Sequence, residues 1–82
     1  MPEVTVLYFA QARDRLGRDC DTLVLPASAD AAAVLAAISA RHPANSALIA
    51  RCRVAVDCQF IAGPVPLSPQ SEIALIPPVS GG

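Results

Sequence analysis

One convincing helix, set among segments typical of strands, is the feature that most limits how this chain of 82 residues can fold. The segment SADAAAVLAAISARHP, residues 28–43, offers Ser28 or Asp30 to cap its first turn, and Pro43 prevents the helix from continuing. At about 100° per residue, its larger apolar side chains gather on one face, while alanines with high helix propensity occupy the other. The face to be buried consists of Ala31, Val34, Leu35 and Ile38.

The segments around this helix predict a sheet. EVTVLYFA is rich in β-branched and aromatic residues and predicts a strand from about Val4 to Ala10. CDTLVLP predicts a second strand that Pro26 ends, and QARDRLG between them predicts a short helical turn ended by Gly17. RVAVDCQFIAG predicts two short strands around a tight turn near Asp57 and Cys58, and EIALIP predicts a last strand.

This order of elements predicts a two-layer α+β fold, with one face of the helix packed on one face of the sheet. The first and last strands are the most apolar, so we expect them side by side at the centre of the sheet. The segment PVPLSPQS contains three prolines and predicts a loop. We assign residues 1–76 to a single domain and residues 77–82 to an extended tail that ends in Gly-Gly.

Composition excludes several classes of protein. The net charge of −1 and the scattered arginines are unlike the basic patch of a nucleic-acid binder. No stretch has the length of a membrane span and the N-terminus lacks a basic leader region, so we expect a cytoplasmic protein with neither nucleic acid nor membrane as partner. Only three residues are aromatic, so the core is expected to be thin and to contain Tyr8, Phe9 and Phe60.

The sequence lacks the motifs of common active sites. It has no phosphate-binding glycine loop, no HExxH motif and, with one histidine, no plausible Ser-His-Asp triad. His42 is expected to cap the helix or to pack at its end. The cysteines lack the spacing of a metal or redox site, and the acids stand in polar segments where exposed carboxylates are usual. These residues are Cys20, Cys52 and Cys58, and Asp14, Asp19, Asp21 and Glu72. We therefore expect no active site, bound cofactor or metal within the domain.

The chain ends in IPPVSGG, residues 76–82. If the last strand stops at Ile76, six residues extend about 20 Å beyond the sheet, at roughly 3.3 Å each. Pro77 and Pro78 favour an extended base, while Gly81 and Gly82, which lack a Cβ, are able to pass through a narrow channel. A terminal carboxylate reacts only after activation, for example as an acyl-adenylate made by an ATP-binding partner. The alternative is a frayed terminus without a role.

Three stretches resemble the MoaD-like family, the small subunits of molybdopterin synthase within the ubiquitin-like β-grasp sulfur carriers. VLYFAQARDRLG is similar to the F-A-x-x-R-x-x-x-G pattern of the family, RVAVD to its central A-V-N segment, and EIALIPPVSGG to its ending. Asp57 stands where the family usually has Asn, and Gln70-Ser71 where Gly-Asp is common. The resemblance covers essentially the whole chain and implies a β-grasp fold, a mixed sheet with one main helix packed on one face.

By this resemblance, Gly82 is the functional residue. A MoeB-like, E1-like adenylyltransferase would use ATP to adenylate it, and a sulfur donor protein would replace AMP to leave a covalent 1-thioglycine. The thiocarboxylate sulfur would then attack cyclic pyranopterin monophosphate in a MoaE-like large subunit and build the molybdopterin dithiolene. The resemblance also implies a heterotetramer, with two small subunits at the ends of a large-subunit dimer. The protein would have no active site of its own.

The resemblance further implies residues that bind partners. Phe9, Phe60 and Ile76 match an apolar patch of the family, although each is equally well explained as a core residue. Arg13 matches an arginine of the family, and a solvated charge at a helix end explains it equally well. The remaining contact residues are those of the tail: Pro77, Pro78, Val79, Ser80 and Gly81.

Other functions use the same kind of tail. A sulfur carrier for thiamine, cysteine or tRNA thiolation and a ubiquitin-like modifier are the main alternatives, and a plain interaction module is a third. The FAxxR stretch and PPVSGG favour the molybdenum branch. The chain has no lysine, which suggests the hypothesis that an activated tail meets no competing side-chain amine; codon bias is the alternative. A lysine inserted near the tail should then raise self-conjugation under activating conditions, and an unchanged level would contradict the hypothesis.

Overall fold

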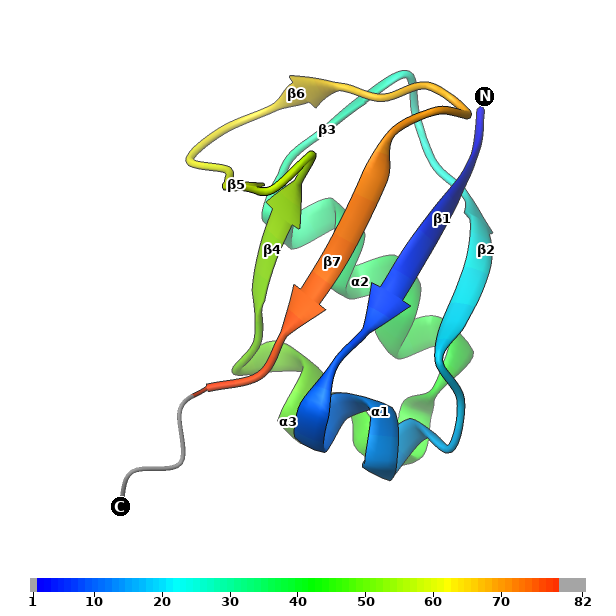
Figure 1. The fold of residues 1–82 in the computed structure, drawn as a ribbon, viewed down its shortest axis with the longest axis vertical. Coiled ribbons are helices and arrows are strands. Elements are labelled where there is room, and N and C mark those ends of the chain that lie inside the picture. Colours follow the sequence, from blue (N-terminus) through cyan, green and yellow to red (C-terminus); the bar gives the residue numbers. More distant parts are fainter. Residues whose placement is uncertain (1, 79–82) are drawn as a thin grey trace.

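The computed structural model of the protein describes residues 2–78 and contains a five-stranded mixed sheet with helices on one face (Figure 1). The strands of this sheet are β1 (Glu3–Tyr8), β2 (Cys20–Val24), β4 (Arg53–Val56), β5 (Gln59–Phe60) and β7 (Glu72–Ile76). Their order is β2-β1-β7-β4-β5, and β1 and β7 pair in parallel, whereas the other neighbours are antiparallel. The first and last strands therefore lie side by side near the centre, which confirms the prediction.

The main helix, α2 (Ala31–Arg41), packs across the inner face of the sheet. Asp30 caps it, because its Oδ1 accepts a hydrogen bond of 2.9 Å from the Ala33 N–H. Val34 and Ile38 are fully buried, and burying side chains of this size contributes about 1.5–3 kcal/mol each. The shorter helical elements are α1 (Ala10–Leu16), η1 (Pro43–Asn45) and α3 (Ser46–Ala50). One main helix on one face of a mixed sheet confirms the expected α+β class.

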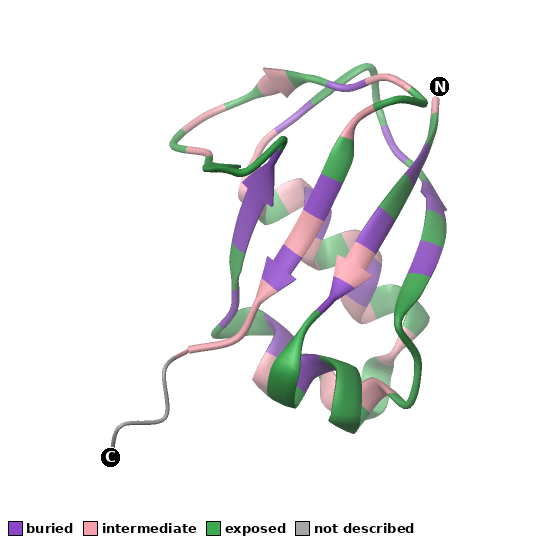
Figure 2. Cartoon of the chain, in the orientation of Figure 1, coloured by how far each residue is buried: buried purple, intermediate pink, exposed green. Residues whose placement is uncertain are grey.

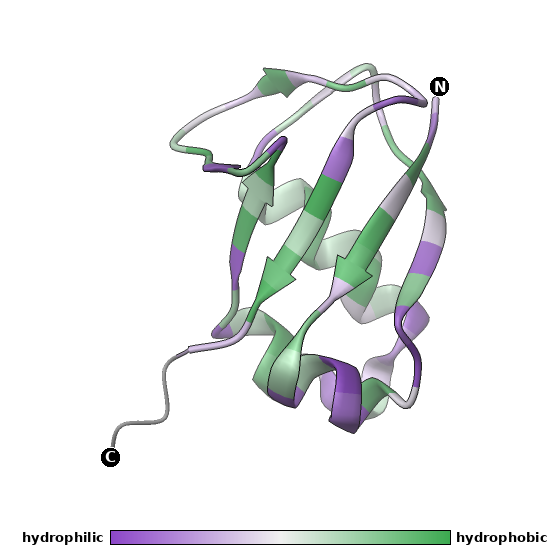
Figure 3. Ribbon diagram, in the orientation of Figure 1, coloured by the Kyte–Doolittle hydropathy of each residue, from purple (hydrophilic) through white to green (hydrophobic). Residues whose placement is uncertain are grey.

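The core lies between α2 and the inner face of the sheet. Burial alternates residue by residue along β1 and β2, because successive side chains of a strand point to opposite faces (Figure 2). Figure 3 shows that β1 and β7 are largely hydrophobic, whereas α1 carries several hydrophilic residues. The core includes Val4, Val6, Tyr8, Leu23, Val34, Ile38, Ile49, Val54, Ile73 and Leu75.

Two turns form where the sequence predicted them. The Gly17 backbone, with a φ of 74°, ends α1, and its N–H donates to the Arg13 carbonyl at 2.9 Å. Between β4 and β5, Asp57 and Cys58 have φ values of 50° and 71°, as both central residues of a type I′ hairpin turn require. The Oδ1 of Asp57 also accepts from the Glu72 N–H at 2.9 Å, which ties the turn to the start of β7.

Two local predictions are wrong. The first strand ends at Tyr8 rather than Ala10, because Phe9 is the N-cap of α1 and the chain turns at Ala10, where φ is 49°. The segment PVPLSPQS, predicted to be a loop, contains the short strand β6 (Val65–Pro66). β6 pairs with β3 (Ser28–Ala29), which comes directly before Asp30, the cap of the main helix. Long-range pairing, which local propensity does not report, decides the second case.

Candidate functional site

The chain leaves the sheet through its central strand β7, which ends at Ile76, where the last strand was predicted to stop. Pro77 and Pro78 continue outward from the end of the sheet that lies next to α1 (Figure 1). A hollow of about 550 Å³ lies at this point; its lining residues are Phe9, Ala10, Gln11, Asp14, Ile76, Pro77 and Pro78. Residues 79–82 lie outside the described residues, so the roles of Val79, Ser80, Gly81 and Gly82 stay predictions.

An apolar patch covers the outer, helix-free face of the sheet beside the tail base. We define the outer patch as Phe9, Ala55, Phe60, Ala74 and Ile76, which line a hollow of about 290 Å³ together with Cys58 and Glu72. The register places Ala55 opposite both Ala74 and Phe60. The small alanine side chains form the bottom of this hollow, and the larger side chains surround it.

Phe9 and Phe60 lie outside the core, contrary to the expectation that both are core residues. Their exposed fractions are 44% and 51%, whereas Tyr8, the third aromatic residue, is buried. Phe9 faces outward because it follows the inward-facing Tyr8, and Phe60 faces outward because it pairs with Ala55, which lies on the outer face. The structure thus brings Phe9, Phe60 and Ile76 together on one sheet face, as the family resemblance suggested. Exposed apolar clusters of this kind are typical of protein interfaces, and their role here stays a prediction.

One cation borders the outer patch at the end nearest the tail. The guanidinium carbon of Arg53 lies 3.8 Å from the centroid of the Phe60 ring, within the range of a cation–π contact. Arg53 also lies opposite Ile76 in the register of β4 and β7, so its charge is close to the tail base. Glu72 borders the same hollow at the other end of β7. A partner for this surface is therefore expected to be apolar at its centre and acidic near the tail.

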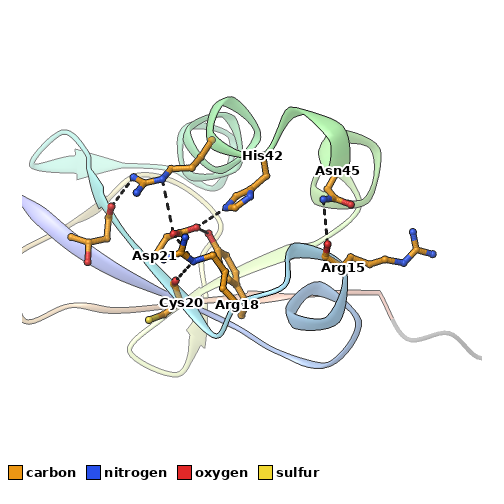
Figure 4. A network of polar contacts seen from close by, with 9 residues as sticks. Arg15, Arg18, Cys20, Asp21, His42 and Asn45 are labelled. Carbon is orange, nitrogen blue, oxygen red and sulfur yellow. Dashed lines mark hydrogen bonds and ion pairs between the residues drawn. The ribbon is translucent and has the colours of Figure 1, made fainter.

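A second cluster, on the inner side of β2, is polar and centred on Asp21 (Figure 4). The Tyr8 hydroxyl donates to Asp21 Oδ2 at 2.6 Å, and His42 Nε2 lies 2.6 Å from the same oxygen. Because an ionised carboxylate only accepts, that nitrogen of His42 carries the proton. Arg18 Nε lies 3.0 Å and Arg41 Nε 4.0 Å from Asp21 Oδ1. Oδ1 itself accepts no aligned hydrogen bond within the described residues, so these two contacts are electrostatic.

This cluster corrects the expectation that Asp21 is solvated. Asp21 is buried because it shares the inward face of β2 with Leu23. Asp21 lies two positions before Leu23 in a predicted strand, and this spacing, which sequence analysis overlooked, indicates that both side chains lie on the same face. His42 does end α2, with its backbone N–H donating to the Ile38 carbonyl at 2.9 Å, and its ring packs edge-on against Tyr8. The predicted capping and packing role is thus confirmed, and the contact with Asp21 is added to it.

The network favours the ionised form of the Asp21 carboxyl group and the protonated form of the Tyr8 hydroxyl group. Burial alone raises the pKa of Asp21, but the hydrogen bonds from His42 and Tyr8 and the charge of Arg18 outweigh it and lower the pKa overall. Burial, followed by the hydrogen bond to Asp21 and its negative charge, raises the pKa of Tyr8 well above its usual range. These residues line neither of the two hollows described above, and we interpret the network as structural.

The cysteines carry free thiols, with Cys20 and Cys58 exposed and Cys52 buried. The Cys52 thiol donates to the Leu48 carbonyl at 3.3 Å, and burial raises its pKa. Among residues 2–78, no group of three or more histidine, cysteine or acidic side chains is arranged to hold a metal ion. Within the same range, no helix is both long and apolar enough to cross a membrane.

The sheet order, the packed helix and the central C-terminal strand define a ubiquitin-like β-grasp protein. The structure superimposes on SAMP1 from Haloferax volcanii with a TM-score of 0.77 and 24% identity, covering 98% of this chain and 99% of that one. A second structure, small archaeal modifier protein 1 of H. volcanii, gives a TM-score of 0.78 and 21% identity, covering 96% and 100%.

Residues 6–82 match the ThiS family, and the chain belongs to that family. Three of its relatives are each named molybdopterin synthase sulfur carrier subunit. The protein from Chlamydomonas reinhardtii is 34% identical over 82 residues, covering 98% of this chain and 99% of that one. The proteins from Mycosarcoma maydis and Homo sapiens are 36% and 32% identical, covering 99% and 98% of this chain and 95% and 94% of theirs. The family resemblance predicted from the sequence is confirmed.

Proposed function

We propose that this protein is the sulfur carrier subunit of a molybdopterin synthase. The observation that carries the proposal is the nearly full-length similarity to proteins of that name, at 32–36% identity. The structure supports it in two ways. The central strand β7 leads directly into the tail base, and the exposed outer patch lies beside the exit point. A cytoplasmic location fits a chain with three free thiols, because such thiols persist in a reducing compartment.

The chemistry of the proposal takes place at Gly82. A C-terminal carboxylate is a poor electrophile, since at neutral pH it is an anion with an ordinary pKa of about 3.3–3.7. A MoeB-like partner would bring ATP, the carboxylate oxygen would attack the α-phosphate, and pyrophosphate would leave. The terminal sulfur of a persulfide on a sulfur donor protein would then attack the acyl carbon and displace AMP. A thiol would reduce the sulfur–sulfur bond that then joins the two proteins and would itself end in a disulfide. The product is a thiocarboxylate on Gly82, whose sulfur is far more nucleophilic than the oxygen that it replaces.

The second half of the proposal is sulfur delivery. The MoaE-like large subunit would bind cyclic pyranopterin monophosphate, and the tail would carry its sulfur to that substrate. Each dithiolene needs two sulfur atoms, so a spent carrier must leave and a charged one must take its place. The domain contributes binding and orientation, while the partners contribute the ATP site and the pterin site.

The outer patch is the surface that would dock on these partners. Phe9, Phe60 and Ile76 supply exposed apolar area next to the tail base, and Arg53 adds a cation at that end. Aromatic residues and arginine are typical anchors of protein interfaces. The activating enzyme and the large subunit would use this surface in turn, because the tail can enter only one active site at a time. Two small subunits on a large-subunit dimer would form the complete enzyme.

Intact-mass analysis tests the carrier role. The protein is incubated with an E1-like partner, ATP and a sulfur source, and the expected mass gain corresponds to the replacement of one oxygen by sulfur. Deletion of Gly82 should abolish the gain, and omission of ATP serves as the matched control. An unchanged mass in the intact protein, with a partner known to be active on another carrier, would contradict the proposal.

Reconstitution then identifies the pathway. The thiocarboxylated protein is mixed with a purified MoaE-like subunit and the pterin precursor, and formation of molybdopterin is the expected result. Formation of thiazole, cysteine or thiolated tRNA in place of molybdopterin would assign the protein to another sulfur-carrier pathway. Isopeptide adducts on protein lysines in cells would instead support a ubiquitin-like modifier.

A further inference from the structure

The two edges of the five-stranded sheet differ in length. β5 has two residues, whereas β2 has five and is free along one side within the described structure. In the antiparallel β1–β2 pair, the Tyr8 N–H donates to the Asp19 carbonyl at 2.8 Å and the Leu25 N–H to the Pro2 carbonyl at 3.1 Å. Because the pairing alternates along the strand, the backbone groups of Cys20, Thr22 and Val24 point to the free edge.

Two arginines cover two of the three carbonyl oxygens at this free edge, those of Cys20 and Thr22. Arg18 Nε donates to the Cys20 carbonyl at 2.9 Å, and Arg41 Nη1 donates to the Thr22 carbonyl at 3.1 Å. A strand that approached this edge would have to place its own N–H groups on the same two oxygens. The guanidinium groups therefore occupy the positions that an additional strand needs.

The buried carboxylate of Asp21 holds both arginines near the edge. Its Oδ1 lies 3.0 Å from Arg18 Nε and 4.0 Å from Arg41 Nε (Figure 4). The Asp21 side chain is fully buried, and its other oxygen is held by Tyr8 and His42, so the anchor has little freedom to move. Both arginine side chains are about half exposed, so water screens their attraction to Asp21. The main contribution of the two arginines is therefore the position of their guanidinium groups at the edge.

We propose that Arg18, Arg41 and Asp21 form an edge guard, which prevents β2 from pairing with β2 of a second copy of this chain. Unprotected strand edges pair readily with other strands, and proteins often block them with charged side chains. The side chains along the outward face of β2 are Cys20, Thr22 and Val24, none of which carries a charge that would repel a second copy. The edge guard is independent of the function proposed above.

The test removes both guards and measures self-association. In sedimentation equilibrium, we expect the unaltered protein to be a monomer and the Arg18→Ala/Arg41→Ala variant to dimerise at least about tenfold more tightly, because pairing of the two uncovered edges gains strand hydrogen bonds. Amide hydrogen exchange at Thr22 should slow in the variant as its concentration rises. The Arg15→Ala/Arg51→Ala variant is the matched control, because it loses the same charge from two exposed residues.

A third substitution tells edge pairing apart from other association. Adding Thr22→Pro to the double variant removes an N–H that points to the free edge, so it should restore the monomer without breaking the β1–β2 pair. A folded double variant that stays monomeric, with unchanged exchange at Thr22, would overturn the proposal. The proposal would also be overturned by a dimer that persists with Thr22→Pro. The same holds if the control variant dimerises as tightly as the double variant, or if the unaltered protein is itself a dimer. If the double variant fails to fold, the single variants Arg18→Ala and Arg41→Ala take its place. Each should dimerise more tightly than the unaltered protein, although less tightly than expected for the double variant. Two folded single variants that both stay monomeric would overturn the proposal.

Discussion

Asp21 is the residue whose environment departs furthest from the expectation of the sequence. Its carboxylate sits beneath the edge of the sheet, where Tyr8, His42 and two arginines surround it. A buried carboxylate is costly unless it is paired, and here several partners share its charge. The network therefore stabilises the fold only as a unit.

Replacement of Asp21 by alanine should destabilise the protein strongly. The Tyr8 hydroxyl and His42 Nε2 would lose their shared partner while remaining largely buried, at a cost of about 3 kcal/mol. Urea unfolding measures the loss. Asp19→Ala, at an exposed neighbouring position, is the control and should change the free energy of unfolding by less than about 0.5 kcal/mol. Equal effects of the two substitutions would contradict the assigned role of Asp21.

The β4–β5 hairpin is an element in which the local sequence and the turn geometry disagree. Cys58 occupies a left-handed position with a φ of 71°, which glycine adopts without strain. Asp57, the other central residue of the turn, gains compensating hydrogen bonds to Glu72. Strain in this turn is thus concentrated at Cys58.

Cys58→Gly should stabilise the protein by about 1 kcal/mol, because it relieves this strain and creates the favoured Asp-Gly turn. The midpoint of urea unfolding measures the gain. Cys20→Gly serves as the control, since Cys20 lies in a strand, where glycine is unfavourable, and this variant should lose stability. A Cys58→Gly variant no more stable than the unaltered protein would show that the turn is not strained.

A substitution on the outer face of the sheet should affect partner binding more than folding stability. Phe60 is 51% exposed, so Phe60→Ala should cost less than about 1.5 kcal/mol of folding free energy, well below the 3–5 kcal/mol of a buried phenylalanine. If the outer patch docks on a MoaE-like subunit, the same change should weaken that complex by about 1–3 kcal/mol, measured by calorimetry. Val24→Ala is the control, because Val24 is 57% exposed but lies on the edge strand β2, outside the patch. Equal weakening by both variants would argue against the patch.

The stability of the whole molecule should depend on pH in the acid range, and Asp21 should make the largest contribution to this dependence. The pKa of Asp21 is lower in the folded protein than in the unfolded chain, so the unfolded chain binds its proton first as the pH falls. The stabilisation is fully present above the unfolded pKa of about 3.9 and is lost as the pH falls through the folded value. The free energy of unfolding should therefore drop below about pH 4, and less steeply in Asp21→Asn. Parallel profiles for the two proteins would contradict this prediction.

The sequence by itself determined the elements whose signals are local. Residue spacing predicted the buried face of α2, Gly17 and the Asp57-Cys58 pair predicted their turns, and the apolar character of β1 and β7 predicted their central pairing. The terminal motif also indicated the family, because its residues are consecutive in the chain.

Only the tertiary structure decided several other features that join distant segments. The short pair of β3 and β6, the burial of Asp21 against His42 and the arginine-covered edge of β2 all depend on contacts between separate elements. The sequence also left undecided whether Phe9 and Phe60 are buried or exposed, since an aromatic residue suits a core as well as an interface. Local propensity describes a residue and its neighbours in the chain, whereas burial is settled by which segment packs on the other side.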